Sequence, residues 1–184
     1  AAATVNRSFP VVKSDQTISL TPISNLTVGS SLMVSASATS GLPVTLASTT
    51  PSVCSVSGST VTGKGVGTCT ITASQAGNTS FNAAATVNQS IAVYKRPQQI
   101  TFAALAAINV GGIVSASASA SSGLPITFSS LTPSICSVST NRVTGLLAGT
   151  CSIAANQAGN TTFSAAAQVN QSFPVTKLSQ TLVL

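Results

Sequence analysis

The 184-residue chain has no histidine and no tryptophan, and Asp15 is its single carboxylate side chain. Charged residues make up 4% of the sequence, against about a quarter of an ordinary soluble domain. Without histidine or a second acid, the chain offers no carboxylate pair, no acidic calcium loop and no Ser-His-Asp relay. The sequence therefore predicts a protein that is not an enzyme, with no catalytic residues, no cofactor and no metal site.

Long apolar runs are missing as well. No stretch approaches the 18 or so apolar residues that would cross a bilayer, so we expect no transmembrane segment in this sequence. Apolar residues nevertheless make up 43% of the chain, and most of its polarity comes from scattered Ser, Thr, Asn and Gln. This composition is the reverse of that of a disordered chain. It suits strands whose outer faces are covered by hydroxyl groups.

An internal repeat organises the chain, with a constant offset of 82 residues (136 − 54 = 82 for two of the cysteines) and no gap. The offset relates the following pairs: Cys54 and Cys136, Cys69 and Cys151, Gly41 and Gly123, and Phe81 and Phe163. About half of all positions in the two copies are identical. A repeat of this kind predicts two modules with the same fold.

The repeat also extends to both ends of the sequence. The segment from Ala1 aligns with those from Ala83 and Ala165, and the segment from Gln180 aligns with that from Gln16. We therefore expect a window on a longer tandem array. Its predicted parts are the last strand of a preceding repeat (1–15), two whole repeats (16–97 and 98–179) and the first strand of a following repeat (180–184).

Apolar and polar residues alternate within each copy, over residues 32–39, 54–57, 69–74 and 81–93. This period of two marks half-buried strands. Gly and Pro separate the runs, and no stretch of a dozen residues has helical spacing. Roughly seven short strands in about 80 residues are typical of an antiparallel sandwich. The sequence thus predicts an all-β protein made of tandem immunoglobulin-like antiparallel β-sandwich modules with an 82-residue period.

Each repeat has two cysteines 15 residues apart at inward-facing positions, which we assign to neighbouring strands. A metal site is the alternative, but the chain has no CxxC pair and no histidine. We therefore predict the disulfides Cys54–Cys69 and Cys136–Cys151, and we exclude the long-range inter-sheet bridge of antibody domains because the loop is short. Disulfides persist in oxidising compartments. This predicts an extracellular, cell-surface or secreted protein.

The segment from Ser40-Gly-Leu-Pro-Val through Thr50-Pro-Ser-Val-Cys to Val93 resembles the immunoglobulin-like repeats of large bacterial surface and secreted proteins of the adhesin type. Its most specific part runs from Cys54 through Gly-Thr-Cys-Thr-Ile-Thr-Ala to Gln75-Ala-Gly-Asn. The resemblance covers both whole repeats and both partial ends. It implies a β-sandwich that serves as a stalk, spacer or filament module, and it transfers no binding site.

Three of the seven basic residues, Lys13, Lys95 and Lys177, occupy one position of the repeat, where one copy passes into the next. They are candidate contacts for an anionic partner such as an acidic cell-surface glycan. The alternative is a solvated lysine that keeps a strand edge from pairing wrongly. Specific nucleic-acid binding is not expected, because such proteins carry denser basic clusters with stacking aromatic residues.

Taken together, these features predict a structural module of an extended extracellular or cell-surface fibre or adhesin stalk, acting as a semi-rigid, disulfide-stapled spacer. Its expected partners are the neighbouring repeats of the same chain or fibre. Two alternatives remain open at this point. One is an adhesive binding module for glycan or anionic surface polymers, and the other is a polymerising filament subunit.

Overall fold

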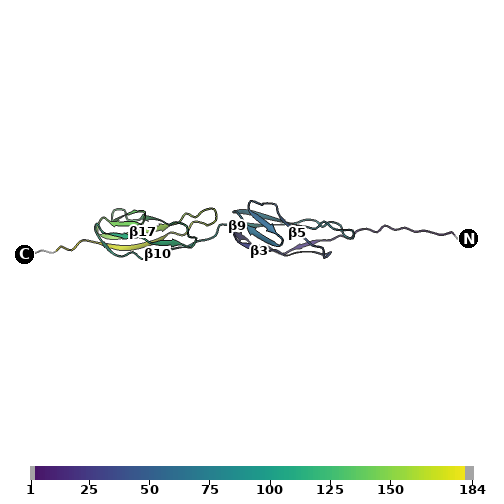
Figure 1. The fold of residues 1–184 in the computed structure, drawn as a ribbon, viewed down its shortest axis with the longest axis horizontal. Helices are drawn as coiled ribbons and strands as arrows, with labels where there is room; N and C mark the ends of the chain where they lie inside the picture. The colour runs from purple at the N-terminus through teal and green to yellow at the C-terminus, as the bar shows by residue number, and fades with distance from the viewer. Residues whose placement is uncertain (1–2, 181–184) are drawn as a thin grey trace, which may run out of the picture. The chain divides into compact units, whose positions relative to one another are not determined.

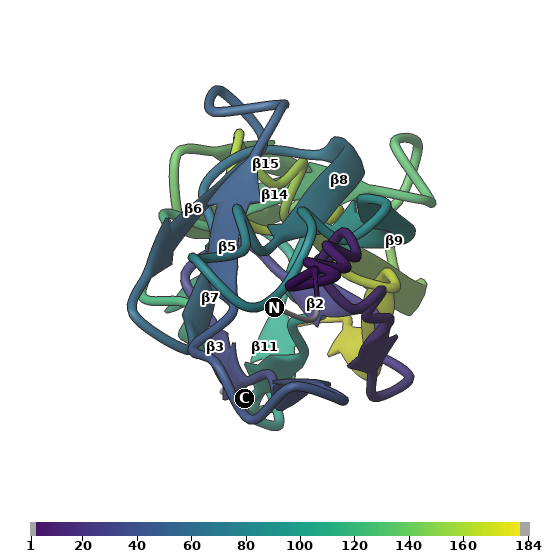
Figure 2. The same cartoon turned by 90° about the vertical axis from the view of Figure 1, so that its right-hand side faces the viewer.

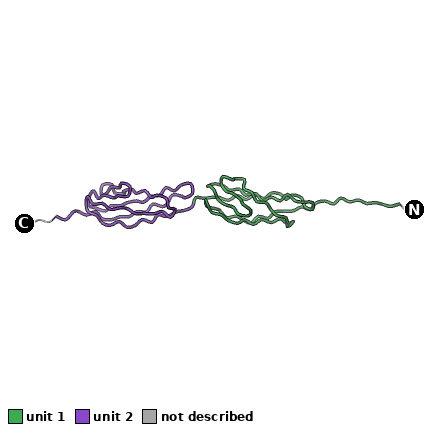
Figure 3. The backbone as a smooth tube through the Cα atoms, in the orientation of Figure 1, with its two compact units in different colours: residues 1–95 green, residues 96–184 purple. Residues whose placement is uncertain are grey.

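The computed structural model describes residues 3–180, and within that range every regular element is a β-strand. The chain divides into two compact units, residues 1–95 and residues 96–184 (Figure 3). We call them unit 1 and unit 2. The fold is therefore all-β, and each unit is built from short strands that are joined by turns.

Unit 1 contains two main sheets that enclose its core (Figure 1). One is four-stranded in the order β2-β9-β8-β5, the other is three-stranded in the order β3-β7-β6, and β1 and β4 form a separate pair. Figure 2 shows β3, β6 and β7 on one side of the unit and β8 and β9 on the other. The strands are β1 (Ile18–Leu20), β2 (Leu26–Thr27), β3 (Ser31–Met33), β4 (Ala36–Ala38), β5 (Thr45–Ser48), β6 (Cys54–Ser57), β7 (Thr60–Gly63), β8 (Gly67–Ser74) and β9 (Val87–Tyr94).

Unit 2 repeats this arrangement strand for strand, each element lying 82 residues after its counterpart (100 − 18 = 82 for β10 and β1). Its sheets have the orders β11-β18-β17-β14 and β12-β16-β15, with β10 and β13 as the separate pair. The strands are β10 (Ile100–Phe102), β11 (Ile108–Asn109), β12 (Ile113–Ser115), β13 (Ala118–Ala120), β14 (Thr127–Ser130), β15 (Cys136–Ser139), β16 (Arg142–Gly145), β17 (Gly149–Asn156) and β18 (Val169–Thr176).

Alternation along the long strands places one set of side chains in the core. In β8 the side chains of Cys69, Ile71 and Ala73 are fully buried, and the residues between them face outward. Val61 on β7, in the opposite sheet, belongs to the same core cluster as Cys69 and Ile71. Small and β-branched residues of this kind fill a sandwich whose two sheets lie close together.

The parallel pairs of each unit join a segment near its beginning to a segment near its end. Short β2 pairs with the end of β9 in parallel, with Leu26 opposite Val93, and β11 pairs with β18 in the same way. Ser14 also forms an isolated parallel bridge to Phe81, and Arg96 forms one to Phe163. The other strand pairs are antiparallel, as in an ordinary sandwich.

The segments that the sequence predicts as partial repeats lie at the two ends of the chain. Residues 3–13 form no strand, and Phe9 and Val11 in this segment are 81% and 91% exposed, whereas the equivalent residues Ile91 and Val93 are buried in β9. The assignment of residues 1–15 as the last strand of a preceding repeat stays a prediction. Of the segment 180–184, residues 181–184 lie outside the described residues.

Candidate functional site

Each unit has one disulfide, which lies in its core. Cys54 is joined to Cys69 with Cα atoms 5.6 Å apart, and Cys136 is joined to Cys151 with Cα atoms 5.7 Å apart. All four cysteines are fully buried. Among the described residues no cysteine is free.

The position of these bridges corrects the sequence interpretation. The sequence interpretation places each pair on neighbouring strands, and this is wrong: Cys54 lies on β6 of the three-stranded sheet and Cys69 lies on β8 of the four-stranded sheet. Each bridge joins the two sheets through a short loop, whereas the bridge that the sequence excludes is the long-range one of antibody domains. The chain crosses from one sheet to the other in the three residues between Gly63 and Gly67. A short loop therefore suffices for an inter-sheet bridge, because β7 returns antiparallel to β6 and ends beside Cys54.

A buried glutamine network, which sequence reasoning missed, closes the end of each unit where the chain enters. In unit 2 the side chain of Gln98 is 8% exposed, and its Nε2 donates hydrogen bonds to Gln157 Oε1 at 2.8 Å and to the Ser164 carbonyl at 2.6 Å. Ser122 Oγ donates to Gln98 Oε1. We call these four residues the entrance clasp of unit 2.

Unit 1 has the same clasp, formed by Gln16, Ser40, Gln75 and Asn82. Gln16 Nε2 donates to Gln75 Oε1 at 2.8 Å and to the Asn82 carbonyl at 2.6 Å. The one signal in the sequence is that Gln recurs at the first position of each copy, in Gln16, Gln98 and Gln180. Recurrence alone does not show which distant residues the side chain contacts.

The three repeat-related lysines are all exposed. Lys95 directly follows the last residue of β9, and Lys177 directly follows the last residue of β18. Their role as contacts for an anionic partner stays a prediction. The neighbouring Arg96 is engaged within unit 2, where its guanidinium carbon lies 5.4 Å from the centre of the Phe163 ring, a distance at which a cation is attracted to the ring face.

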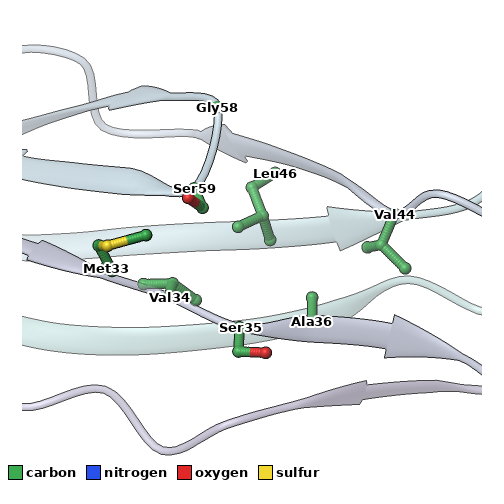
Figure 4. A pocket seen from close by; sticks show the side chains of 8 residues that line it. All are labelled: Met33, Val34, Ser35, Ala36, Val44, Leu46, Gly58 and Ser59. Carbon is green, nitrogen blue, oxygen red and sulfur yellow. The ribbon is translucent and has the colours of Figure 1, made fainter.

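Unit 1 also has an open pocket of about 390 Å³ at one side of the sandwich, lined by apolar side chains and by Ser35 and Ser59 (Figure 4). Figure 4 shows Val34 and Ala36 on one side of this space and Leu46 on the other. In unit 2 the residue equivalent to Leu46 is Phe128, whose ring lies 5.4 Å from that of Phe102. The pocket thus coincides with a position at which unit 2 has a larger side chain.

Acidic and metal-binding side chains are sparse in the part of the chain that the structure describes. There, no three residues from His, Cys, Asp and Glu lie close enough to hold a metal ion. The carboxylate of Asp15 accepts a hydrogen bond from Asn82 Nδ2 at 2.8 Å. Within residues 3–180, no helix is long and apolar enough to span a membrane.

No protein-family model and no curated protein matches the sequence. Solved structures resemble it at 12–16% sequence identity. Domains 1–6 of the surface layer protein SbsC are 13% identical, with a TM-score of 0.39, and the match covers 90% of this chain and 28% of that one. The EC1–4 fragment of Drosophila N-cadherin is 13% identical, with a TM-score of 0.34, and the match covers 94% of this chain and 49% of that one. A C-terminal fragment of intimin, solved with the intimin-binding domain of its translocated receptor, is 16% identical, with a TM-score of 0.31, and the match covers 88% of this chain and 51% of that one.

The chain spans about half the length of the cadherin and intimin fragments and 28% of the surface-layer fragment. At these identities and TM-scores, the likeness carries no information about a ligand or an activity of this chain.

Proposed function

We propose that the chain is a structural part of an extended extracellular or cell-surface fibre or stalk, in which its units act as semi-rigid spacers. The observation that carries this proposal is the short interval between the units. Strand β9 of unit 1 ends at Tyr94, and Arg96 already donates its backbone N–H to the Thr162 carbonyl of unit 2 at 2.8 Å. Lys95 is the single residue between these two paired positions.

A joint of one residue argues for restricted bending between the units, because the end-to-end distance that a flexible linker can span grows with its length. Repeat proteins whose modules follow one another without long linkers form extended structures. Arg96 makes a second backbone hydrogen bond, because the Ser164 N–H donates to the Arg96 carbonyl at 3.0 Å. The joint is therefore anchored by backbone hydrogen bonds on the side of unit 2.

The buried disulfides support the extracellular part of the proposal. Bonds of this kind form and persist in oxidising compartments. A small sandwich with many Ala, Ser and Val side chains buries little apolar area per residue, and a disulfide offsets that shortage. The protein isolated from its source should accordingly contain no free thiol, which a thiol-labelling assay under denaturing conditions measures.

Small-angle X-ray scattering tests the spacer role. We expect a narrow distribution of interatomic distances for the native chain and a broader one after about six Gly-Ser residues are inserted behind Lys95. The same insertion behind Gly41, in an exposed turn of unit 1, is the matched control and should leave the distribution narrow. Equal breadth for the native chain and the Lys95 insertion would mean that the joint is already flexible, and the spacer proposal would fail.

A further inference from the structure

The parallel pairs of unit 2 lie where the chain enters and leaves it. At the entrance, Arg96 bridges to Phe163. At the exit, Ile108 and Asn109 of β11 lie opposite Val175 and Thr176 of β18, and the Val110 N–H donates to the Thr176 carbonyl at 2.9 Å. Both pairs join a segment from the beginning of the unit to a segment near its end.

Parallel pairing has a mechanical consequence. When the chain is pulled from both ends, the early segment is drawn toward its N-terminus and the late segment toward its C-terminus. Two parallel partners then slide along each other, and their hydrogen bonds are loaded together. In antiparallel partners joined by a turn, the same pull opens the bonds one after another. The pairs at both ends of unit 2 are consequently loaded in shear.

The entrance clasp adds side-chain bonds to the entrance pair. Gln98 lies two residues after Arg96, and its amide reaches two segments that follow it by 59 and 66 residues, at Gln157 and Ser164. Gln157 is itself anchored, since its Nε2 donates to the Pro125 carbonyl at 3.2 Å. The Gln98 side chain thus ties the entering segment to the loop that precedes β18.

From this geometry we infer a tension-bearing function for the entrance clasp: Gln98 and its partners keep the entering segment from peeling away when the chain is pulled. The inference rests on the proposed fibre role, which supplies the tension. Unit 1 has the equivalent device at Gln16, with the Ser14 bridge to Phe81 in front of it. A chain under load would therefore be held at the entrance of each unit rather than unravelling from it.

Single-molecule pulling on the full chain tests this inference with two neighbouring substitutions. Gln98→Glu keeps the shape of the side chain but turns the N–H donor into a carboxylate that faces the Gln157 and Ser164 oxygens. Gln99→Glu adds the same charge one residue away, at an exposed position. We expect Gln98→Glu to raise the rate at which one of the two units unfolds at constant force by about tenfold or more. Gln99→Glu should leave both rates unchanged.

Equal unfolding rates for the two variants would overturn the inference. Such a result would leave the spacer proposal intact, since scattering tests that proposal separately. If Gln98→Glu prevents unit 2 from folding, Ser122→Ala replaces it, because it removes the hydroxyl that donates to Gln98 Oε1 and accepts the Leu124 N–H. We expect it to unfold about threefold faster under force, against no change for Ser119→Ala on the exposed face of β13. No difference between these two serine variants would also overturn the inference.

Discussion

Asn25 and Ala92 are joined by a hydrogen bond whose donor and side-chain acceptor are both absent from the equivalent positions of unit 2. Asn25 Oδ1 accepts the backbone N–H of Ala92 at 2.9 Å. At the equivalent positions of unit 2, Ala107 has no side-chain acceptor and Pro174 has no backbone N–H. The proline leaves the β17–β18 ladder intact because the N–H that it lacks points away from β17. Unit 2 therefore lacks this donor and this acceptor together, which leaves neither partner of the bond unpaired.

Removing the acceptor alone should expose that N–H. In Asn25→Ala we expect the Ala92 amide to exchange with solvent about tenfold faster, and unit 1 to lose about 1 kcal/mol of stability. Hydrogen exchange followed by NMR measures the first effect. The reciprocal substitution Ala107→Asn is the control, since Pro174 cannot donate to it. Unchanged exchange at Ala92 would mean that the bond contributes nothing.

The Phe128 position predicts how the pocket of unit 1 can be filled. Phe128→Leu should lower the stability of unit 2 by about 1–2 kcal/mol, because it removes ring contacts with Phe102 and leaves a cavity. Leu46→Phe should leave unit 1 equally stable or up to about 1 kcal/mol more stable, because the pocket has room for the ring. Thermal unfolding of both variants checks this. A marked loss of stability in Leu46→Phe would show that the pocket cannot take the ring.

The buried disulfides should resist reduction in the folded state. Both sulfur pairs are inaccessible to solvent, so a reductant should act only after a unit opens. We expect thiols to appear slowly in native buffer and rapidly near the midpoint of denaturation. Replacing Cys54 and Cys69 by Ala should cost about 3 kcal/mol in unit 1, from the entropy of a loop of this size. Rapid reduction without denaturant would contradict the burial of the bridge.

Two glycines with nearly equal backbone angles separate conformational strain from steric overlap. Gly123 and Gly159 have φ of 74° and 75°. A Cβ at Gly123 would meet nothing within 4 Å, whereas one at Gly159 would collide with the backbone of Phe163 and Ser164. Gly123→Ala should therefore cost about 1 kcal/mol, from strain alone.

Gly159→Ala should cost at least about 3 kcal/mol, because the overlap lies beside the entrance clasp and its backbone cannot move aside without disturbing Gln157. Denaturant unfolding of the two variants measures the difference. Similar losses for both would indicate that the loop after Gln157 adapts.

Several parts of the structure follow from local pattern. The alternation over residues 69–74 predicts a strand with Cys69, Ile71 and Ala73 inside, and β8 buries these three side chains. The sequence also predicts the all-β class, because no segment has the 3.6-residue period of a helix. These features depend on neighbours along the chain, whose geometry is fixed by the pleat of a strand.

The alternation of apolar and polar residues does not show which of the two sheets a strand belongs to. The alternation predicts that Cys54 and Cys69 both face inward, but not that they belong to opposite sheets, since period two is the same in either sheet. The two cysteines lie in opposite sheets because the chain passes from one sheet to the other between Gly63 and Gly67.

Local patterns along the chain specify the 82-residue repeat, the strand-forming segments and the side chains that face inward. Which strands pair, which sheets the disulfides join and why Gln98 is buried depend on contacts between distant segments. Its partners Gln157 and Ser164 are 59 and 66 residues away, and a polar side chain is buried only where distant groups satisfy its hydrogen bonds. That condition depends on how the whole unit folds, and no local period records it.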